Sequence, residues 1–167
     1  FLPQSPKHGQ SPELLRLFVM KKSFCLFVAL WAVSGQAASL QLNKGDHISI
    51  IGNTLADRMQ HAGWLETRIH VRFPKHELVF RNLSFPGDTV TTRPRSANFG
   101  NTDQWLTKMK SDVVFMFFGY NESLAGEAGI PGFKQNLAKL VQHTREQKYN
   151  GKSAPRIVLF TPIAHEN

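Results

Sequence analysis

Three short polar stretches of the sequence hold the residue types that acyl-transfer chemistry needs. They are Gly52-Asn53-Thr54, Gly87-Asp88-Thr89 and Gly119-Tyr120-Asn121-Glu122. A hydroxyl such as that of Thr54 can attack a carbonyl carbon, and fixed N–H groups can stabilise the negative charge that develops on the carbonyl oxygen. Glycine allows close approach to its backbone amide, and the Asn121 side chain donates hydrogen bonds without carrying a charge. Together, the stretches form a candidate catalytic site.

Each stretch follows an apolar run that predicts a buried strand, and helical spacing of apolar residues occurs between the runs. We expect strands over 47–51, 78–84, 112–119 and 156–160. We expect helices over 55–73 (with a break at Gly63 and an end at Pro74), 103–110 and 131–147. This alternation predicts an α/β fold, a three-layer α/β/α sandwich with a parallel, flavodoxin-like sheet. The carboxyl ends of parallel strands share one edge, so we expect the three polar stretches to converge there.

The three stretches, in this order and after these strands, resemble the blocks of the SGNH (GDSL-type) hydrolases from about Lys44 onward. The resemblance implies that Thr54 stands at the position of the serine nucleophile and Asn53 at that of the preceding aspartate. It also implies that the Gly87 backbone N–H and the Asn121 side chain face the oxyanion. As the first residue of a helix, Thr54 offers its own amide as a third donor.

The sequence departs from the family at several points. Threonine replaces serine, Glu122 replaces the aspartate of the third block, and the Asp-x-x-His block that supplies the base does not occur. We therefore interpret 40–167 as an incomplete SGNH-hydrolase-like domain, truncated at its C-terminus, whose base lies further downstream. Thr54 and Asn53 have an alternative role as helix caps, and Gly87 as a type II turn glycine. Asp88 and Thr89 fit side-chain hydrogen bonds that hold the same turn.

Further side chains are candidates for substrate binding because they follow the strands: Asn53, Asp88, Glu122 and His165. His165 does not fit the role of base, since Pro162 occupies the position three residues before it. The histidines lack ligand spacing, so we predict no metal and no organic cofactor. Nucleotide binding is disfavoured because the 52–58 segment matches neither a GxGxxG nor a GxxxxGK[ST] motif.

The N-terminal part of the chain has the pattern of an export signal. Met20-Lys21-Lys22 precedes a short apolar run and then small residues, which predicts a signal peptide over 20–38 with cleavage after Ala37. The Pro- and Ser-containing residues 1–19 are interpreted as an unstructured upstream segment. We expect a periplasmic or secreted bacterial protein, without stable membrane insertion after cleavage. The only cysteine, Cys25, lies in the signal, so the domain has no thiol chemistry.

Composition narrows the class of partner. Hydrophobic residues make up 41% and charged residues 19% of the chain, as in a globular protein. The net charge of +8 raises the question of nucleic acid, but from Leu40 onward 16 basic and 11 acidic residues leave +5, without a basic run. We therefore predict no nucleic-acid partner.

Two functions remain open. The first is an exported hydrolase that acts on an acyl or acetyl ester, with a small-molecule or carbohydrate substrate. The second is a catalytically inactive binding module of the same fold within a larger exported protein. Both use the same polar stretches, and they differ in whether Thr54 attacks.

Overall fold

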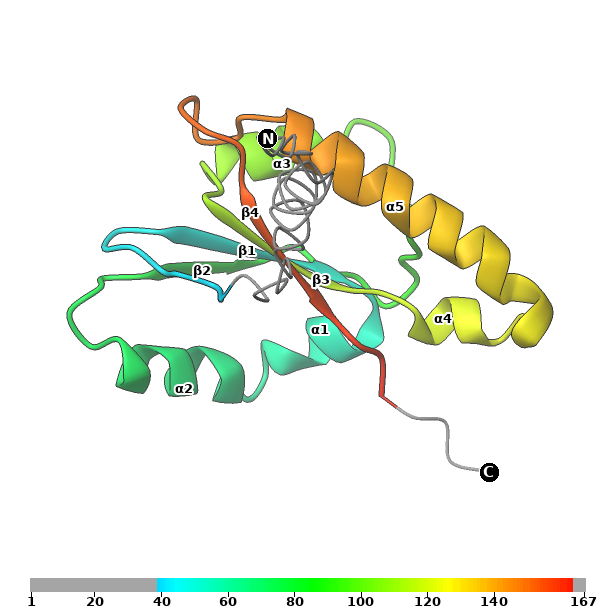
Figure 1. Ribbon diagram of the computed structural model, residues 1–167, viewed down its shortest axis with the longest axis horizontal. Coiled ribbons are helices and arrows are strands. Elements are labelled where there is room, and N and C mark those ends of the chain that lie inside the picture. Colours follow the sequence, from blue (N-terminus) through cyan, green and yellow to red (C-terminus); the bar gives the residue numbers. More distant parts are fainter. Residues whose placement is uncertain (1–38, 164–167) are drawn as a thin grey trace, which may run out of the picture. The chain divides into compact units, whose positions relative to one another are not determined.

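The computed structural model describes residues 39–163 (Figure 1). The predicted unstructured segment 1–19, the predicted signal peptide 20–38 and His165 lie outside the described residues. They therefore stay predictions.

A parallel sheet of four strands forms the centre of the described domain. The strands are β1 (His47–Gly52), β2 (Val79–Asn82), β3 (Val113–Phe117) and β4 (Arg156–Phe160), in the order β2-β1-β3-β4. All three strand pairs are parallel. β3 is buried along its whole length, as its unbroken apolar sequence predicts. The α/β fold with a parallel, flavodoxin-like sheet is thus confirmed.

Helices cover both faces of this sheet (Figure 1). They are α1 (Thr54–Met59), α2 (Trp64–Arg72), α3 (Thr102–Lys108), α4 (Tyr120–Ser123), a 3-10 turn (Glu127–Gly129) and α5 (Ile130–Glu146). Gly63 separates α1 from α2 in the left-handed conformation, with φ of 63°, which confirms the predicted break. The four-residue α4 was not predicted, because one helical turn is too short to show a period.

Two apolar clusters fill the spaces between the sheet and its helices. On one face, α1 and α2 contribute Leu55, Met59, Leu65 and Ile69 to a core around Ile48, Ile50 and Phe115. On the other face, α3 and α5 pack Leu106, Phe133, Leu137 and Leu140 against Ile51, Val114 and Met116. Alternate side chains of each strand therefore enter opposite cores, and the strands are held in one register.

The strand order places a topological switch between β1 and β3. From β1 the chain moves to β2 on one side, then crosses to β3 on the other side and continues to β4. The register pairs Gly52 with Phe117, so both strands end at the same level. Parallel sheets bind ligands in the crevice outside the carboxyl ends at such a switch. The first and third polar stretches begin at this point.

Within residues 39–163, no helix has the length and apolar character needed to span a bilayer.

Candidate active site

The three polar stretches meet at the carboxyl edge of the sheet. The Thr54 Oγ1 hydroxyl donates to the Pro86 carbonyl oxygen at 3.1 Å, and the Asn121 Nδ2 amide donates to the same oxygen at 3.2 Å. Pro86 immediately precedes Gly87. The first and third stretches therefore donate to a carbonyl group that adjoins the second stretch. The expected convergence of the loops is present in the described structure.

The Asn121 side chain uses both of its N–H groups on the second stretch. Its other hydrogen bond goes to the Asp88 carbonyl oxygen at 3.0 Å. An amide nitrogen has two hydrogens, so the Asn121 donors are taken by backbone acceptors in this conformation. An oxyanion could use Asn121 only after replacing one of these carbonyls.

Gly87 lies in an exposed turn with open space beside it. The turn is closed by a hydrogen bond from the Asp88 N–H to the Phe85 carbonyl, at 3.0 Å. A type II turn needs positive φ at Gly87, and Gly87 is not among the positive-φ glycines, so the type II interpretation is wrong. A Cβ built on Gly87 would meet no atom within 4 Å. The turn is therefore open on the side where a Cβ would lie, and the role of the Gly87 N–H as an oxyanion donor stays a prediction.

Asn53 and Thr54 do not cap α1 through their side chains. Asn53 occupies the N-cap position, yet its side chain makes no capping hydrogen bond, and Thr54 is already the first helical residue. The Asn53 residue is 2% exposed and its Nδ2 nitrogen is buried without a hydrogen-bond partner. Asn53 thus holds the N-cap position through its backbone, and the prediction that its side chain caps the helix is wrong. The same prediction is wrong for Thr54 because the hydroxyl reaches across to Pro86.

Glu122 connects the third stretch to the second. One carboxylate oxygen accepts the Gly119 N–H at 2.9 Å, and the other accepts the Val90 N–H at 2.7 Å. Carboxylate–amide hydrogen bonds of this kind are charge-assisted and hold both loops in place. A role of Glu122 toward substrate stays a prediction, since both of its oxygens already have donors.

Asp88 is held by an arginine that the sequence analysis did not identify. The two oxygens of Asp88 accept bidentate hydrogen bonds from Arg95, at 2.7 and 2.8 Å, and Asp88 is 1% exposed. The hydrogen bonds to Asp88 raise the pKa of the Arg95 guanidinium, which also lies 4.7 Å from the centre of the Phe85 ring. Asp88 therefore does not hold its turn through side-chain to backbone bonds. Thr89 does not hold that turn either, because its Oγ1 accepts the Thr92 N–H at 2.9 Å and so closes the next turn, over 89–92.

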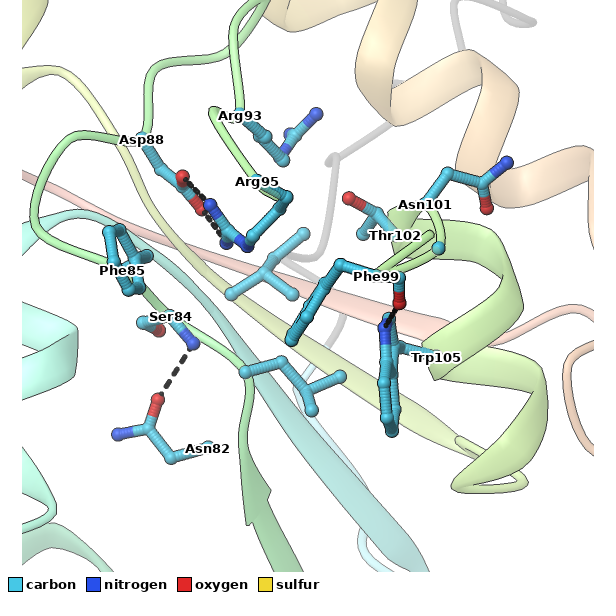
Figure 2. A pocket seen from close by; sticks show the side chains of 13 residues that line it. Asn82, Ser84, Phe85, Asp88, Arg93, Arg95, Phe99, Asn101, Thr102 and Trp105 are labelled. Atoms are coloured by element: carbon cyan, nitrogen blue, oxygen red, sulfur yellow. Dashed lines mark hydrogen bonds and ion pairs between the residues drawn. The ribbon is translucent and has the colours of Figure 1, made fainter. Parts of the chain in front are cut away.

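A cavity of about 400 Å³ is lined by Phe85 and Asp88 of the 85–88 turn and by residues of the 91–100 loop and α3 (Figure 2). Figure 2 shows Asp88 and Arg95 facing each other on one side of it, with Phe99 and Trp105 on the opposite side. The Trp105 indole N–H donates to the Phe99 carbonyl at 2.9 Å and so ties the 91–100 loop to α3. The sequence does not predict that Arg93, Arg95 and Phe99 line a cavity, because an irregular loop shows no periodic pattern.

The described residues hold no group of three or more histidine, cysteine, aspartate or glutamate side chains that could bind a metal ion. Within the same range, the hydrogen bond of the Thr54 hydroxyl goes to a backbone carbonyl and not to a histidine. A carbonyl oxygen accepts a proton far less readily than an imidazole, so this contact does not activate the hydroxyl.

No protein-family model matches the chain, and no curated protein matches it. Among solved structures, it is similar to "BT4096 a gut microbial diltiazem-metabolizing enzyme", with a TM-score of 0.53 and 18% identity over 72% of this chain and 28% of that one. It is also similar to the structure of TesA, with a TM-score of 0.49 and 19% identity over 68% of this chain and 59% of TesA.

The chain thus spans 28% and 59% of the lengths of these two proteins. At an identity of 18%, the likeness to the first of these proteins is one of fold alone. The chain therefore shares an α/β fold with an enzyme, and its polar stretches lie at the edge where parallel sheets place their ligand sites.

Proposed function

We propose that the chain is the nucleophile-bearing part of an SGNH-type ester hydrolase. In this proposal, Thr54 attacks an acyl or acetyl ester of a small molecule or carbohydrate. The Gly87 N–H and the Asn121 side chain stabilise the oxyanion, and a histidine beyond the described residues accepts the Thr54 proton. The protein is exported to the periplasm or secreted, as the pattern over 20–38 predicts.

The observation that supports this function best is the shared acceptor of Thr54 and Asn121. The proposed nucleophile and one proposed oxyanion donor come from different loops, and they lie 3.1 and 3.2 Å from one carbonyl oxygen. Asn121 thus already binds an sp² oxygen beside the Thr54 hydroxyl, as an oxyanion donor must. After a movement of the exposed turn, a substrate carbonyl would enter this place with its oxygen toward Asn121 and its carbon toward the Thr54 hydroxyl.

The same contacts favour a second candidate, a binding module without hydrolytic activity. The Thr54 hydroxyl donates rather than facing a base, and both N–H groups of Asn121 are occupied. The β-methyl of threonine also restricts χ1 and crowds the attacking oxygen. In this candidate the convergent loops recognise a carbonyl or hydroxyl group, and no bond is broken.

Hydrolysis of p-nitrophenyl acetate by the full-length protein separates the two. If Thr54 is the nucleophile, Thr54→Ala lowers kcat/KM by at least about a thousandfold. Thr54→Ser retains or raises it, because the hydroxyl stays and the methyl group is gone. Thr67→Ala, on the exposed side of α2, is the matched control and leaves the rate unchanged. Equal rates for the wild type and Thr54→Ala would exclude the nucleophilic role.

A further inference from the structure

Two nitrogens of the Arg93 guanidinium have no hydrogen-bond acceptor among the described residues. Its Nε and Nη2 nitrogens are buried without a partner, and its neighbouring ring is that of Phe118, with the centroid at 5.2 Å. Burial lowers the pKa of Arg93. An arginine nevertheless keeps its proton in proteins, so the side chain is a cation. A buried cation without an acceptor is unfavourable unless an anion accompanies it.

Within residues 39–163, no carboxylate accepts a hydrogen bond from the buried Nε and Nη2 of Arg93. Three acidic side chains favour the charged form of Arg93 through space: Asp88, Asp103 and Glu122. Each of them already accepts hydrogen bonds from other donors, namely Arg95, the Tyr149 hydroxyl, and the Gly119 and Val90 amides. The three carboxylates therefore bind other donors, and the Nε and Nη2 hydrogens of Arg93 are left for a ligand to accept.

Arg93 lines the cavity of about 400 Å³, and the remaining walls combine apolar side chains with polar and charged ones. Phe99 and Trp105 lie with their ring centroids 5.2 Å apart on one side, and Ile51 and Leu83 also line the cavity. In Figure 2 the Arg95 guanidinium is turned toward Asp88, whereas that of Arg93 is turned away from it. A pocket of this size that combines aromatic walls with polar groups is suited to a small molecule.

We propose that this cavity binds an organic monoanion, a carboxylate that carries an aromatic group. The carboxylate pairs with Arg93, and the ring packs against Phe99 and Trp105. Among the charged residues that line the cavity, Asp88 is paired with Arg95, and only Arg93 is left without an ion pair, so a monoanion suits it better than a dianion. Nε and Nη2 form one edge of the guanidinium, which matches the two oxygens of a carboxylate once the side chain turns from Phe118 into the cavity. The proposal does not depend on hydrolysis by Thr54.

Calorimetric titration with phenylacetate and with its neutral analogue phenylacetamide tests the assignment. The full-length wild-type protein is expected to bind phenylacetate at least tenfold more tightly than phenylacetamide. Arg93→Met keeps much of the side-chain volume and removes the charge, so it should lose this preference. The Trp105 indole N–H signal, identified with Trp105→Phe, should shift on binding in the NMR spectrum of the wild type.

Two further arginine variants and a second anion, phenyl phosphate, serve as controls. Arg68→Met removes an exposed arginine of α2 and should leave the preference unchanged. Arg93→Lys keeps the charge without the bidentate edge and should bind the acid more weakly while still preferring it to the amide. The proposal is overturned if the wild type binds acid and amide equally or binds neither. Unchanged selectivity in Arg93→Met would also overturn it, as would tighter binding of phenyl phosphate than of phenylacetate.

Discussion

The Thr54 hydroxyl and the Asn121 amide donate to the same acceptor, the carbonyl oxygen of Pro86, at 3.1 and 3.2 Å. These two residues follow β1 and β3, whereas Pro86 belongs to the turn that follows β2. The turn therefore occupies the place between the other two loops. Any ligand oxygen that uses both donors must compete with this carbonyl. The position of the Pro86–Gly87 turn therefore determines whether the two donors can bind a ligand.

Replacing Asn121 by aspartate should separate the loops. A carboxylate would face the Pro86 and Asp88 carbonyl oxygens, which now accept from the amide, so donors are replaced by an acceptor. We expect Asn121→Asp to reduce the free energy of unfolding by about 1–3 kcal/mol at neutral pH. The loss should be smaller at acidic pH, where a protonated carboxyl can donate to one carbonyl.

Urea denaturation at both pH values measures this effect. Asn98→Asp, in the exposed part of the 91–100 loop, is the control, and it should change stability by less than about 0.5 kcal/mol. If both variants are equally stable, the two hydrogen bonds of Asn121 do not hold the turn.

The architecture could be read from the sequence because its signals are local and repeated. Unbroken apolar runs gave the strands, and Gly63 marked the break between α1 and α2. Every strand of the sheet was expected, within one to two residues at most ends. The one-turn α4 was missed, since a helix of four residues shows no apolar period.

The site was only partly predictable, because its contacts join residues far apart in the chain. Spacing after the strands correctly brought Thr54, the Gly87 turn and Asn121 together. It could not show that Thr54 donates to a backbone oxygen in another loop, so helix capping, the usual role of such residues at a helix start, was the favoured alternative. The pairing of Asp88 with Arg95 was not visible either, since it depends on how an irregular loop folds back on the turn.

The Asp88–Arg95 pair should be one of the strongest single contributions to this end of the domain. The Arg95 side chain is 17% exposed and that of Asp88 is 2% exposed, so removing the arginine leaves a carboxylate buried without a counter-charge. We expect Arg95→Met to lower the free energy of unfolding by about 3–5 kcal/mol. Adding Asp88→Asn to this variant should restore part of the loss, because the buried charge is then gone.

An exposed ion pair offers the comparison for that experiment. The side chains of Lys44 and Glu77 are 66% and 71% exposed, so Lys44→Met should cost no more than about 1 kcal/mol. Urea denaturation of the three variants measures the difference. Comparable losses in Arg95→Met and Lys44→Met would show that burial of the Asp88 pair carries no extra energy.

Replacement by alanine should reduce stability at Gly52 but have little effect on stability at Gly87. A Cβ on Gly52 would collide with the Phe117 carbonyl oxygen and lie 2.7 Å from the Phe117 Cβ, where β1 and β3 are paired. We expect Gly52→Ala to lower stability by about 1–3 kcal/mol or more, because neither strand can move freely. Gly87→Ala meets no atom within 4 Å and should leave stability within about 1 kcal/mol of the wild type.

Thermal or urea unfolding of both glycine variants, together with their p-nitrophenyl acetate hydrolysis, checks this pair. If the Gly87 N–H faces the oxyanion, Gly87→Ala should fold normally but hydrolyse the ester more slowly, since its methyl group narrows the approach. A stable Gly52→Ala protein would contradict the tight contact between the strand ends.

Stability at alkaline pH should depend on Tyr149. Burial, and then the hydrogen bond that the hydroxyl donates to Asp103 at 2.6 Å, raise the pKa of Tyr149 above that of an unfolded tyrosine. Above about pH 10 an unfolded chain releases this proton while the folded chain retains it. The folded state then binds more protons than the unfolded state, so stability falls as pH rises, by up to about 1.4 kcal/mol per pH unit. Below that pH the Tyr149 contribution is fully present.

Tyr149→Phe removes the proton and with it this part of the pH dependence. The variant should be less stable than the wild type near neutral pH, because the hydrogen bond to Asp103 is lost. Its stability should then fall less steeply above pH 10, so that the two urea-denaturation curves approach each other. Lysines titrate in the same range but equally in both proteins, so the difference isolates Tyr149. Parallel slopes for wild type and variant would mean that the hydroxyl ionises as easily in the folded state as in the unfolded one.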